Sequence, residues 1–226
     1  IRNFEMGSIY KKESKGVIQE NVLGILIGGN SRKVAWNSQN SGVDFYELKG
    51  EIENIYQITN QQVEFKKLEV KGLHPGKTSS IYLSSNPSEQ IGYLGAIDPS
   101  IADKIGLKDE IIFAQLSCKY FSKTKETNYK NFSRYPASQR DLSFLVDKDT
   151  LSQDIVKLIK QKSNKYEVDI LTFDIYEGAR IESGLKSISY EVKWKSKKGT
   201  LNDAEIDKIV SNIINASEKR SWKIRK

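Results

Sequence analysis

The segment Ile188-Ser189-Tyr190-Glu191-Val192-Lys193-Trp194-Lys195 alternates apolar and polar residues over its whole length. Successive side chains of a β-strand point to opposite faces of the sheet, so this pattern predicts a strand that buries one face and exposes the other. Because such alternation usually means burial on one side, we expect Tyr190 and Trp194 to lie in a core. The lysines and the glutamate of the same strand are expected to meet solvent.

Local patterns on both sides of this strand repeat one unit of strand, helix and strand. The other predicted elements are a strand at 141–147, a helix at 151–162 with Leu151, Ile155, Leu158 and Ile159 on one stripe, a strand at 168–176, a helix after Asn202 and a short last strand at 221–225, at an edge of the sheet or beside the first strand. Asn202 followed three residues later by Glu205 is typical of a helix N-terminus. The order βαββαβ predicts a split ferredoxin-like sandwich in an α+β chain.

The preceding part of the chain predicts an antiparallel sheet with one principal helix. Its strand candidates are 1–10, 23–27, 63–70, 78–83, 92–97 and 111–121, with a turn at 72–76 and a polar connection at 84–89. The helix begins after Asp44, which caps it while Glu47 reaches back. Its inward face carries Phe45, Leu48, Ile52, Ile55 and Tyr56. Asp98-Pro99 starts a second, short helix that ends near Gly106.

Residues 122–131 contain one aromatic residue and no apolar periodicity, which indicates a linker. We therefore expect one domain at 1–121 and another at 132–226, and a chain of 226 residues is long enough for both. The chain begins at Ile1 and enters a strand-like stretch at once, so we interpret it as a piece of a longer polypeptide.

The composition is that of a soluble globular protein, because 38% hydrophobic residues can build a core while 29% charged residues solvate the surface. No apolar run reaches the length of a membrane span, so we expect no membrane partner. Cys118 is the only cysteine, which excludes an internal disulfide and fits a reducing cytosol. We expect a cytoplasmic protein with Cys118 as a structural thiol.

The residue types needed for catalysis are scarce. His74 is the only histidine and lies in a predicted turn, so it is more plausibly structural than catalytic. Paired carboxylates such as Asp147 and Asp149 lie at strand ends or helix starts, where capping explains them. Gly28-Gly29 lacks the lysine and hydroxyl of a phosphate loop. We therefore predict no catalytic residue, no metal site and no cofactor in this chain.

Positive charge is concentrated in the second half of the chain. Residues 1–131 hold 17 Lys and Arg against 15 Asp and Glu, whereas residues 132–226 hold 19 against 14. The basic stretches 193–198 and 219–226 can lie close together in the predicted sandwich. Their cations can bind phosphates while an exposed Tyr or Trp stacks on an unpaired base. The alternative is a solvated, lysine-rich face without a partner.

Several phrases resemble the C-terminal part of the bacterial phenylalanine-tRNA ligase (phenylalanyl-tRNA synthetase) beta subunits, and the resemblance covers nearly the whole chain. In the second domain these phrases are Arg134-Tyr135-Pro136, the run from Arg140 to Asp147, Phe173-Asp174-Ile175-Tyr176-Glu177-Gly178, the run from Gly184 to Ser187 and the run from Thr200 to Ile206. In the first domain they are the run from Val43 to Gly50, His74-Pro75-Gly76 and the run from Ile91 to Pro99.

The resemblance implies a first domain with a class II synthetase-like antiparallel sheet that lacks catalytic motifs, followed by a ferredoxin-fold anticodon-binding domain. It implies assembly with a catalytic alpha subunit in an (αβ)2 heterotetramer, binding of tRNA-Phe through its anticodon region, and ATP and magnesium for the holoenzyme but not for this chain. Gly199 stands where the family typically has Arg, so a contact made by that arginine does not transfer.

The residues best placed by sequence for backbone phosphates of tRNA are Arg134, Arg140, Lys186, Lys193, Lys195, Lys198, Arg220 and Arg225. Arg140 has a rival role in a structural ion pair with the adjacent Asp141, and Lys186 can pin the loop after Gly184. A different class of function also stays open. It is a ferredoxin-like module for assembly or small-ligand regulation that binds no RNA, and its apolar docking would depend far less on salt than phosphate contacts do.

Overall fold

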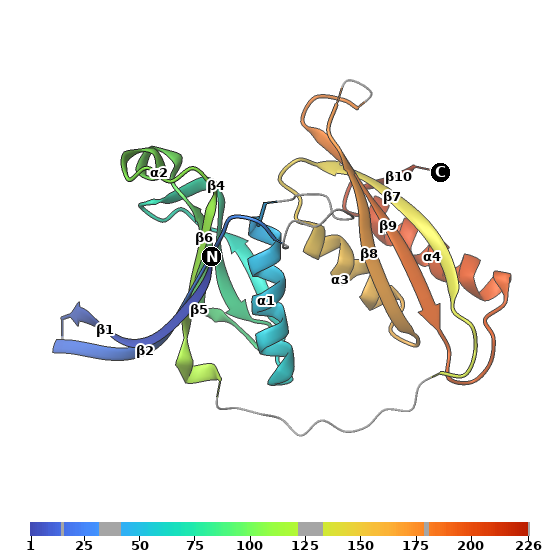
Figure 1. The fold of residues 1–226 in the computed structure, drawn as a ribbon. Helices are drawn as coiled ribbons and strands as arrows, with labels where there is room; N and C mark the ends of the chain where they lie inside the picture. Colours follow the sequence, from blue (N-terminus) through green and yellow to red (C-terminus); the bar gives the residue numbers. More distant parts are fainter. Residues whose placement is uncertain (15, 32–41, 122–132, 179–180, 226) are drawn as a thin grey trace, which may run out of the picture. The chain divides into compact units, whose positions relative to one another are not determined.

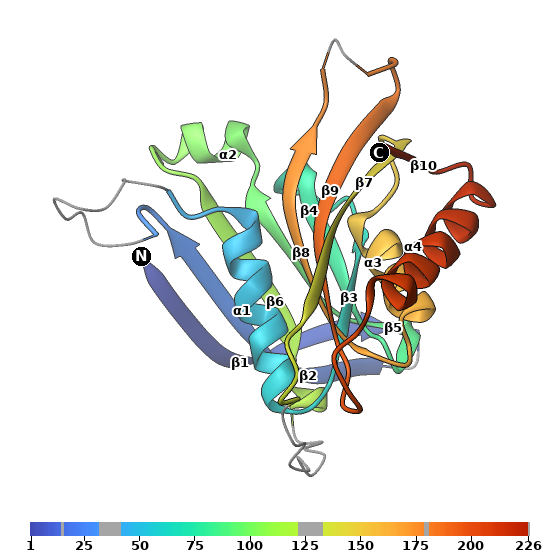
Figure 2. The same ribbon diagram turned by 90° about the vertical axis from the view of Figure 1, so that its right-hand side faces the viewer.

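The computed structural model describes residues 1–14, 16–31, 42–121, 133–178 and 181–225. Two compact units divide the chain, Ile1–Asn128 and Tyr129–Lys226, and each contains a sheet of its own (Figures 1 and 2). The predicted linker at 122–131 lies outside the described residues, so the predicted domain limits stay a prediction.

The sheet of the first unit is antiparallel throughout, with six strands in the order β1-β2-β6-β5-β4-β3. Its strands are β1 (Arg2–Glu13), β2 (Gly16–Gly28), β3 (Val63–Lys67), β4 (Leu73–Leu83), β5 (Asn86–Ile97) and β6 (Ile111–Ser117). This confirms the predicted antiparallel arrangement. β1 and β2 form a hairpin, and both extend beyond the predicted strands 1–10 and 23–27 because backbone pairing continues through polar residues that carry no apolar pattern.

Helix α1 (Phe45–Ile58) covers one face of this sheet (Figure 1). Asp44 caps it by accepting a hydrogen bond from the backbone N–H of Glu47 over 2.8 Å, as predicted. The carboxylate of Glu47 forms an ion pair with Arg2. Leu48 and Ile52 are fully buried against the sheet, so the predicted inward face of α1 is confirmed. The short α2 (Pro99–Lys104), capped by Asp98, and the 3-10 turn η1 (Cys118–Tyr120) complete the unit.

Two predicted connections of the first unit are wrong. The turn expected at 72–76 is instead at Lys71 and Gly72, the φ of Gly72 being +92°, which favours glycine, and β4 already begins at Leu73. Pro75 is tolerated inside β4 because it lies between Leu73 and Thr78, where the pairing with β5 shifts register. Its missing N–H therefore removes no regular hydrogen bond between the two strands. The polar connection expected at 84–89 is mostly strand, because β5 begins at Asn86.

The predicted strand at 111–121 is too long. β6 ends at Ser117, and the chain then turns through η1. The Tyr120 side chain is nevertheless buried in the core of the unit. Tyr120 and the partly buried Phe121 therefore pack on the core without continuing the strand, which a pattern of apolar residues alone does not distinguish.

The second unit has the predicted βαββαβ order in a four-stranded antiparallel sheet, β10-β7-β9-β8. Its elements are β7 (Ser138–Asp147), α3 (Ser152–Lys162), β8 (Glu167–Tyr176), β9 (Leu185–Lys195), α4 (Asp203–Glu218) and β10 (Lys223–Arg225). One core joins alternate residues of β7 and β9 with the inward stripes of both helices, so α3 and α4 cover the same face. The ferredoxin-like prediction is confirmed, with the last strand both at an edge and beside the first.

Two local predictions for the second unit are confirmed and a third is wrong. The Asn202 side chain accepts from the Glu205 N–H over 2.8 Å and the Glu205 carboxylate accepts from the Asn202 N–H over 3.0 Å, which is the expected capping box. Tyr190 and Trp194 are fully buried, as expected. Leu151 is not on the buried stripe of α3. It precedes the first helical residue and is 44% exposed.

Two buried tyrosines differ in whether their hydroxyl groups form a hydrogen bond. The Tyr190 hydroxyl lies 2.8 Å from Ser152 Oγ, and burial raises the pKa of Tyr190 to about 12. The Tyr56 hydroxyl is buried without a hydrogen-bond partner among the residues that the structure describes, and burial raises the pKa of Tyr56 as well.

Replacing Tyr56 by phenylalanine is therefore expected to leave the free energy of unfolding unchanged or to raise it by about 1 kcal/mol, because a desolvated hydroxyl without a partner is removed while the ring stays. Urea unfolding of the two proteins measures the difference. The matched change Tyr190→Phe removes a bonded hydroxyl and is expected to lower stability instead. A loss of stability in Tyr56→Phe as large as that in Tyr190→Phe contradicts this account.

Candidate nucleic-acid interface

One end of the second unit is held together by two side-chain hydrogen bonds. Trp194 Nε1–H donates to Ser163 Oγ over 2.8 Å and fixes the end of α3 against the end of β9. Ser133 Oγ donates to the backbone oxygen of Ser196 over 2.7 Å and ties the segment before β7 to the turn after β9. We call the region formed by residues 133–137, 160–166 and 195–199 the Trp194 end. Figures 1 and 2 show the ends of α3 and β9 on the same side of the unit.

The Trp194 end gathers cations from three separate stretches of sequence. Its exposed cations are Arg134 before β7, Lys160, Lys162 and Lys165 at the end of α3 and after it, and Lys197 and Lys198 after β9. Within the described part of the chain, none of these six side chains forms an ion pair. A group of unpaired cations on one small surface produces a positive potential that attracts polyanions.

Three carboxylates near this end are engaged with other groups. Asp203 accepts from Arg140 over 2.8 Å, and Asp169 accepts from Lys195 over 2.8 Å. The hydrogen bond to Asp169 raises the pKa of Lys195. Glu205 is held in the capping box of α4. Asp203 and Asp169 therefore pair with Arg140 and Lys195, whereas the exposed Glu167, opposite Lys195 in the β8-β9 ladder, adds a negative charge at this end.

Five of the eight residues predicted from sequence lie at or near the Trp194 end. Arg134 and Lys198 are exposed there. Arg140, Lys193 and Lys195 are each paired with a carboxylate, and Lys193 lies 2.5 Å from Glu191. The rival role foreseen for Arg140 is therefore present, but its partner is Asp203 of α4 and not the adjacent Asp141.

The other three predicted residues lie elsewhere. Lys186 is at the start of β9, opposite Val146, and the Arg220 guanidinium lies over the Trp222 ring, 5.2 Å from its centroid. The Arg225 backbone pairs with Ser143, and its side chain lies outside what the structure describes.

The prediction that the two basic stretches lie close together is wrong. Stretch 193–198 precedes α4 and stretch 219–226 follows it. The 16 residues of α4 span about 24 Å along the sheet between them.

The lysines of α3 were not singled out from the sequence. A usable signal is that residues 155–166 contain four lysines and no acidic residue. Taken alone, lysines in the last turn of a helix are explained by the negative end of the helix dipole. The lysines of α3 lie on the same side of the unit as the lysines after β9 because of the contact between Trp194 and Ser163, which joins residues 31 positions apart.

The aromatic side chain available at this end is Tyr135. Tyr190 and Trp194 are in the core and Trp222 is 8% exposed, whereas Tyr135 is 42% exposed. Its backbone N–H donates to Ser133 Oγ over 3.2 Å, and that serine also binds Ser196. The exposed ring therefore extends from a fixed backbone beside the lysines.

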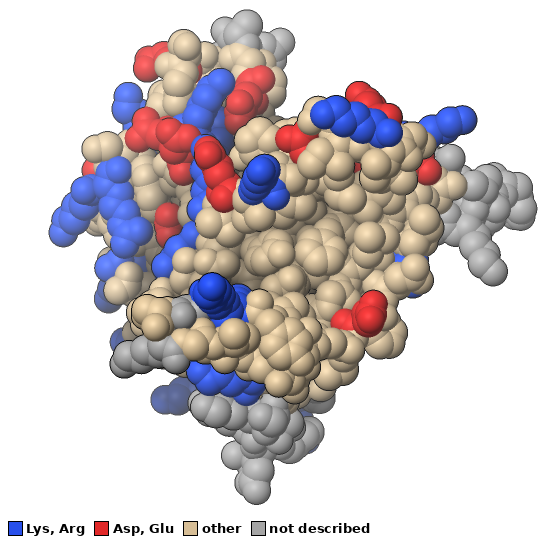
Figure 3. All heavy atoms as spheres, turned by 90° about the vertical axis from the view of Figure 1, so that its left-hand side faces the viewer, with Lys and Arg blue, Asp and Glu red and all other residues tan. Residues whose placement is uncertain are grey.

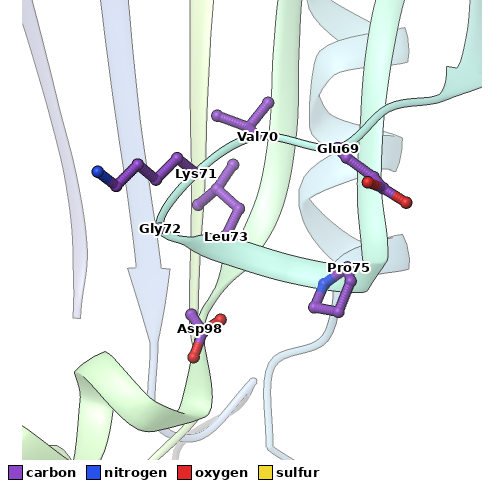
Figure 4. A pocket seen from close by; sticks show the side chains of 7 residues that line it. All are labelled: Glu69, Val70, Lys71, Gly72, Leu73, Pro75 and Asp98. Atoms are coloured by element: carbon purple, nitrogen blue, oxygen red, sulfur yellow. The ribbon is translucent and has the colours of Figure 1, made fainter.

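The face drawn in Figure 3 differs from the Trp194 end in its charge pattern. Figure 3 shows cationic and anionic side chains interspersed around an area without charged side chains. A shallow cavity of about 360 Å³ is formed by Glu69, Val70, Lys71, Gly72, Leu73, Pro75 and Asp98 (Figure 4). The hydroxyl and backbone N–H of Ser100 both donate to the Asp98 carboxylate and lower its pKa, and Lys71 points away from Asp98. The polar groups of this cavity therefore do not converge on a ligand position.

Metal ligands and membrane-spanning helices were also sought. Among the described residues, no group of three or more His, Cys, Asp and Glu side chains is placed to hold a metal ion. No helix in the described part of the chain combines the length and the apolar character needed to cross a bilayer.

The second unit is therefore a small α+β domain of the ferredoxin-like class, with exposed cations and an exposed aromatic ring at one end. Residues 133–225 match the ferredoxin-fold anticodon binding domain, and residues 1–118 match the phenylalanyl tRNA synthetase beta chain CLM domain. The chain therefore belongs to the phenylalanyl-tRNA synthetase beta chain family.

Similar curated proteins are named phenylalanine-tRNA ligase beta subunit. The protein of Hahella chejuensis is 30% identical over 214 residues, with 95% of this chain and 27% of the relative covered. The protein of Bacillus subtilis is 30% identical over 221 residues, with 95% and 27% covered. That of Listeria monocytogenes serovar 1/2a is 32% identical over 223 residues, with 96% and 27% covered. The chain thus spans about a quarter of the length of these relatives.

Proposed function

We propose that this chain acts as part of a phenylalanine-tRNA ligase beta subunit, and that its second unit binds the anticodon region of tRNA-Phe during ATP-dependent aminoacylation. The observation that carries the proposal is the match of residues 133–225 to the anticodon-binding domain, in the same unit that holds the unpaired cations of the Trp194 end. Because tRNA charging serves translation, the proposal includes a cytoplasmic location.

The role of the second unit in this proposal is to position tRNA and not to catalyse. Lysine and arginine side chains bind backbone phosphates, which fixes register and orientation. The predicted set of Arg134, Arg140, Lys186, Lys193, Lys195, Lys198, Arg220 and Arg225 stays part of the proposal. Exposed ion pairs such as those of Lys193 and Lys195 are weak, so a phosphate group can replace their carboxylate partners.

For the first unit, we propose a class II-like module without catalytic motifs that assembles with the alpha subunit of an (αβ)2 enzyme. ATP and magnesium would be bound by that alpha subunit. The proposal places no step of ATP chemistry in this chain.

A salt titration of tRNA binding tests the proposal. The 226-residue chain is expected to bind an unmodified tRNA-Phe transcript with an association constant that falls linearly with salt concentration on logarithmic axes. Contacts of the six exposed cations of the Trp194 end with phosphates predict a slope of about −4 to −5. A non-cognate tRNA measured in parallel shows whether the chain also discriminates. No binding at low salt by a chain with a folded circular dichroism spectrum contradicts the proposal.

The exposed strand β8 favours a second function, docking of a protein partner without RNA. Leu171, Phe173 and Ile175 are each more than half exposed on this edge strand, at 58%, 53% and 55%. Exposed apolar residues on an edge strand are typical of an interaction surface. Docking of the alpha subunit through β8 would be far less sensitive to salt than RNA binding, so the same titration separates the two functions.

A further inference from the structure

We propose that His74 is a pH-sensitive switch in the irregular part of β4, residues 74–77. The neutral ring accepts a hydrogen bond from the backbone of Gly76, and protonation releases Gly76 and turns the ring toward Asp98. This inference concerns the first unit and does not depend on RNA binding by the second. His74 is the only histidine of the chain, so no other imidazole changes its charge in the same pH range.

The ring of His74 is bonded to the backbone two residues further along the chain. The Gly76 N–H donates to His74 Nδ1 over 3.0 Å. The two residues are in close contact, since a Cβ atom added at Gly76 would lie 3.4 Å from His74 Cε1. A ring nitrogen that accepts a hydrogen bond carries no proton, so the neutral ring has its proton on Nε2. Protonation adds an N–H at Nδ1, and because two donors then face each other, the bond to Gly76 is lost.

The segment held by this bond is outside the regular ladder of the sheet. β4 pairs with β5 at Leu73 and again from Thr78, and the register shifts between these two residues. Thr78 Oγ1 donates to the backbone oxygen of His74 over 2.7 Å and fixes the backbone of His74 itself. Pro75 and Gly76 are exposed. Loss of the bond to Gly76 therefore frees the exposed segment and the ring without breaking a strand pair.

Asp98 offers the charged ring a second partner. Hydrogen bonds from Ser100 are the main cause of the lowered pKa of Asp98, and the positive charge of the His74 ring is a smaller cause. Asp98 is therefore a carboxylate throughout the pH range in which an imidazole ordinarily gains its proton. A histidinium is attracted to a nearby carboxylate, whereas a neutral ring is not. The two charge states of His74 thus favour different partners.

The other charged groups around this segment do not compete with Asp98. Lys77 is paired with Glu110 over 2.5 Å. Glu69 and Lys71 line the same shallow cavity as Asp98 and carry opposite charges, so their effects on the ring oppose each other. Lys71 also points away from Asp98 (Figure 4). The Asp98 carboxylate therefore remains the main attraction for a charged ring.

The consequence is a cavity whose wall depends on pH. Leu73 and Pro75, the chain neighbours of His74, line the cavity of about 360 Å³ together with Asp98 (Figure 4). When the ring leaves Gly76 for Asp98, it moves toward this lining, and the segment that contains Pro75 loses its hydrogen bond. One proton on His74 therefore changes the shape of the cavity.

NMR spectroscopy of the 226-residue chain, made without a histidine tag, tests the inference. At pH 8 the ¹⁵N signals of the ring are expected to show one tautomer, with the proton on Nε2. At low pH, once these signals report the charged form, nuclear Overhauser effects between the ring and the Asp98 side chain are expected. A neutral ring with its proton on Nδ1 would overturn the inference.

His74→Asn is the matched control, because Oδ1 of asparagine can accept from the N–H two residues further on and does not titrate. With the wild-type ring charged, the Gly76 N–H is expected to exchange with solvent about 2- to 10-fold faster than in this variant at the same pH. At pH 8 the two exchange rates are expected to agree. Equal rates at both pH values would show that protonation does not release Gly76 and would overturn the inference.

Asp98→Asn tests the second partner separately. Asparagine can still cap α2 but carries no charge. The variant is expected to lose the low-pH contacts between the ring and residue 98 while the Gly76 N–H is still released. Persistence of these contacts in Asp98→Asn would overturn the role of Asp98 as the partner of the charged ring.

Discussion

Replacing Trp194 by alanine is expected to lower the free energy of unfolding of the second unit by about 4 kcal/mol. Trp194 is fully buried and is the largest of the buried side chains. Its removal leaves a cavity between β9 and α3, and the neighbouring side chains can fill that cavity only partly. The change also leaves the buried Ser163 hydroxyl without its donor from Nε1. The loss in the free energy of unfolding is therefore expected near the upper end of the range for replacement of a single core residue.

Urea unfolding followed by circular dichroism measures this effect. Trp194→Phe is the matched control, because it keeps an aromatic ring in the core and removes the hydrogen bond to Ser163. Its expected loss is smaller, about 1–2 kcal/mol. The account of the core would be wrong if Trp194→Ala lost less than about 1 kcal/mol. Because Trp194 also aligns α3 with β9, the alanine variant is expected to lose tRNA binding together with stability.

Replacing Gly92 by alanine is expected to destabilise the first unit by about 3 kcal/mol. Gly92 lies in the middle of the sheet and is paired with Leu116 of β6. A Cβ atom at this position would lie 2.4 Å from the backbone oxygen of Gln115 and 2.9 Å from Leu116 Cδ2. A backbone oxygen in a central strand cannot move without loss of ladder hydrogen bonds, so the strain cannot be relieved by rotation of a side chain.

Gly7→Ala in β1 is the matched control for this prediction. Gly7 is also a strand glycine, paired with Val22, but a Cβ added there meets no atom within 4 Å. We expect this variant to be neutral or slightly more stable, because alanine restricts the unfolded chain. Urea midpoints of the two variants provide the comparison. Equal stability of Gly92→Ala and Gly7→Ala would show that β5 and β6 are not packed as described.

The second unit could be predicted closely from sequence because its signals are local. The alternation around Tyr190 and the pairing of Asn202 with Glu205 each identify an element without reference to the rest of the chain. The connections of the first unit were harder. Pro75 suggests a turn, yet long-range pairing of β4 with β5 overrides that preference. The Asn86-Pro87 step is likewise absorbed into β5.

The candidate site was less accessible to sequence reasoning because it depends on contacts between distant residues. The sequence shows that Lys195 and Lys198 are basic, but not that Asp169 already binds Lys195. It also does not show that α4 separates Arg220 from Lys198 by the length of the sheet. Buried aromatic residues were predicted correctly, since strand alternation determines their side of the sheet. Clusters of cations do not follow a periodic pattern in the sequence, so their positions could not be predicted in the same way.

The most direct test of the central claim is hydroxyl-radical footprinting of an end-labelled tRNA-Phe transcript with increasing amounts of the 226-residue chain. Phosphate contacts shield the adjacent riboses from cleavage, so the position of protection identifies the part of the tRNA that is bound. The account predicts protection in the anticodon arm that increases with occupancy. Protection confined to the acceptor arm, or no protection at concentrations where the transcript is bound, would contradict it.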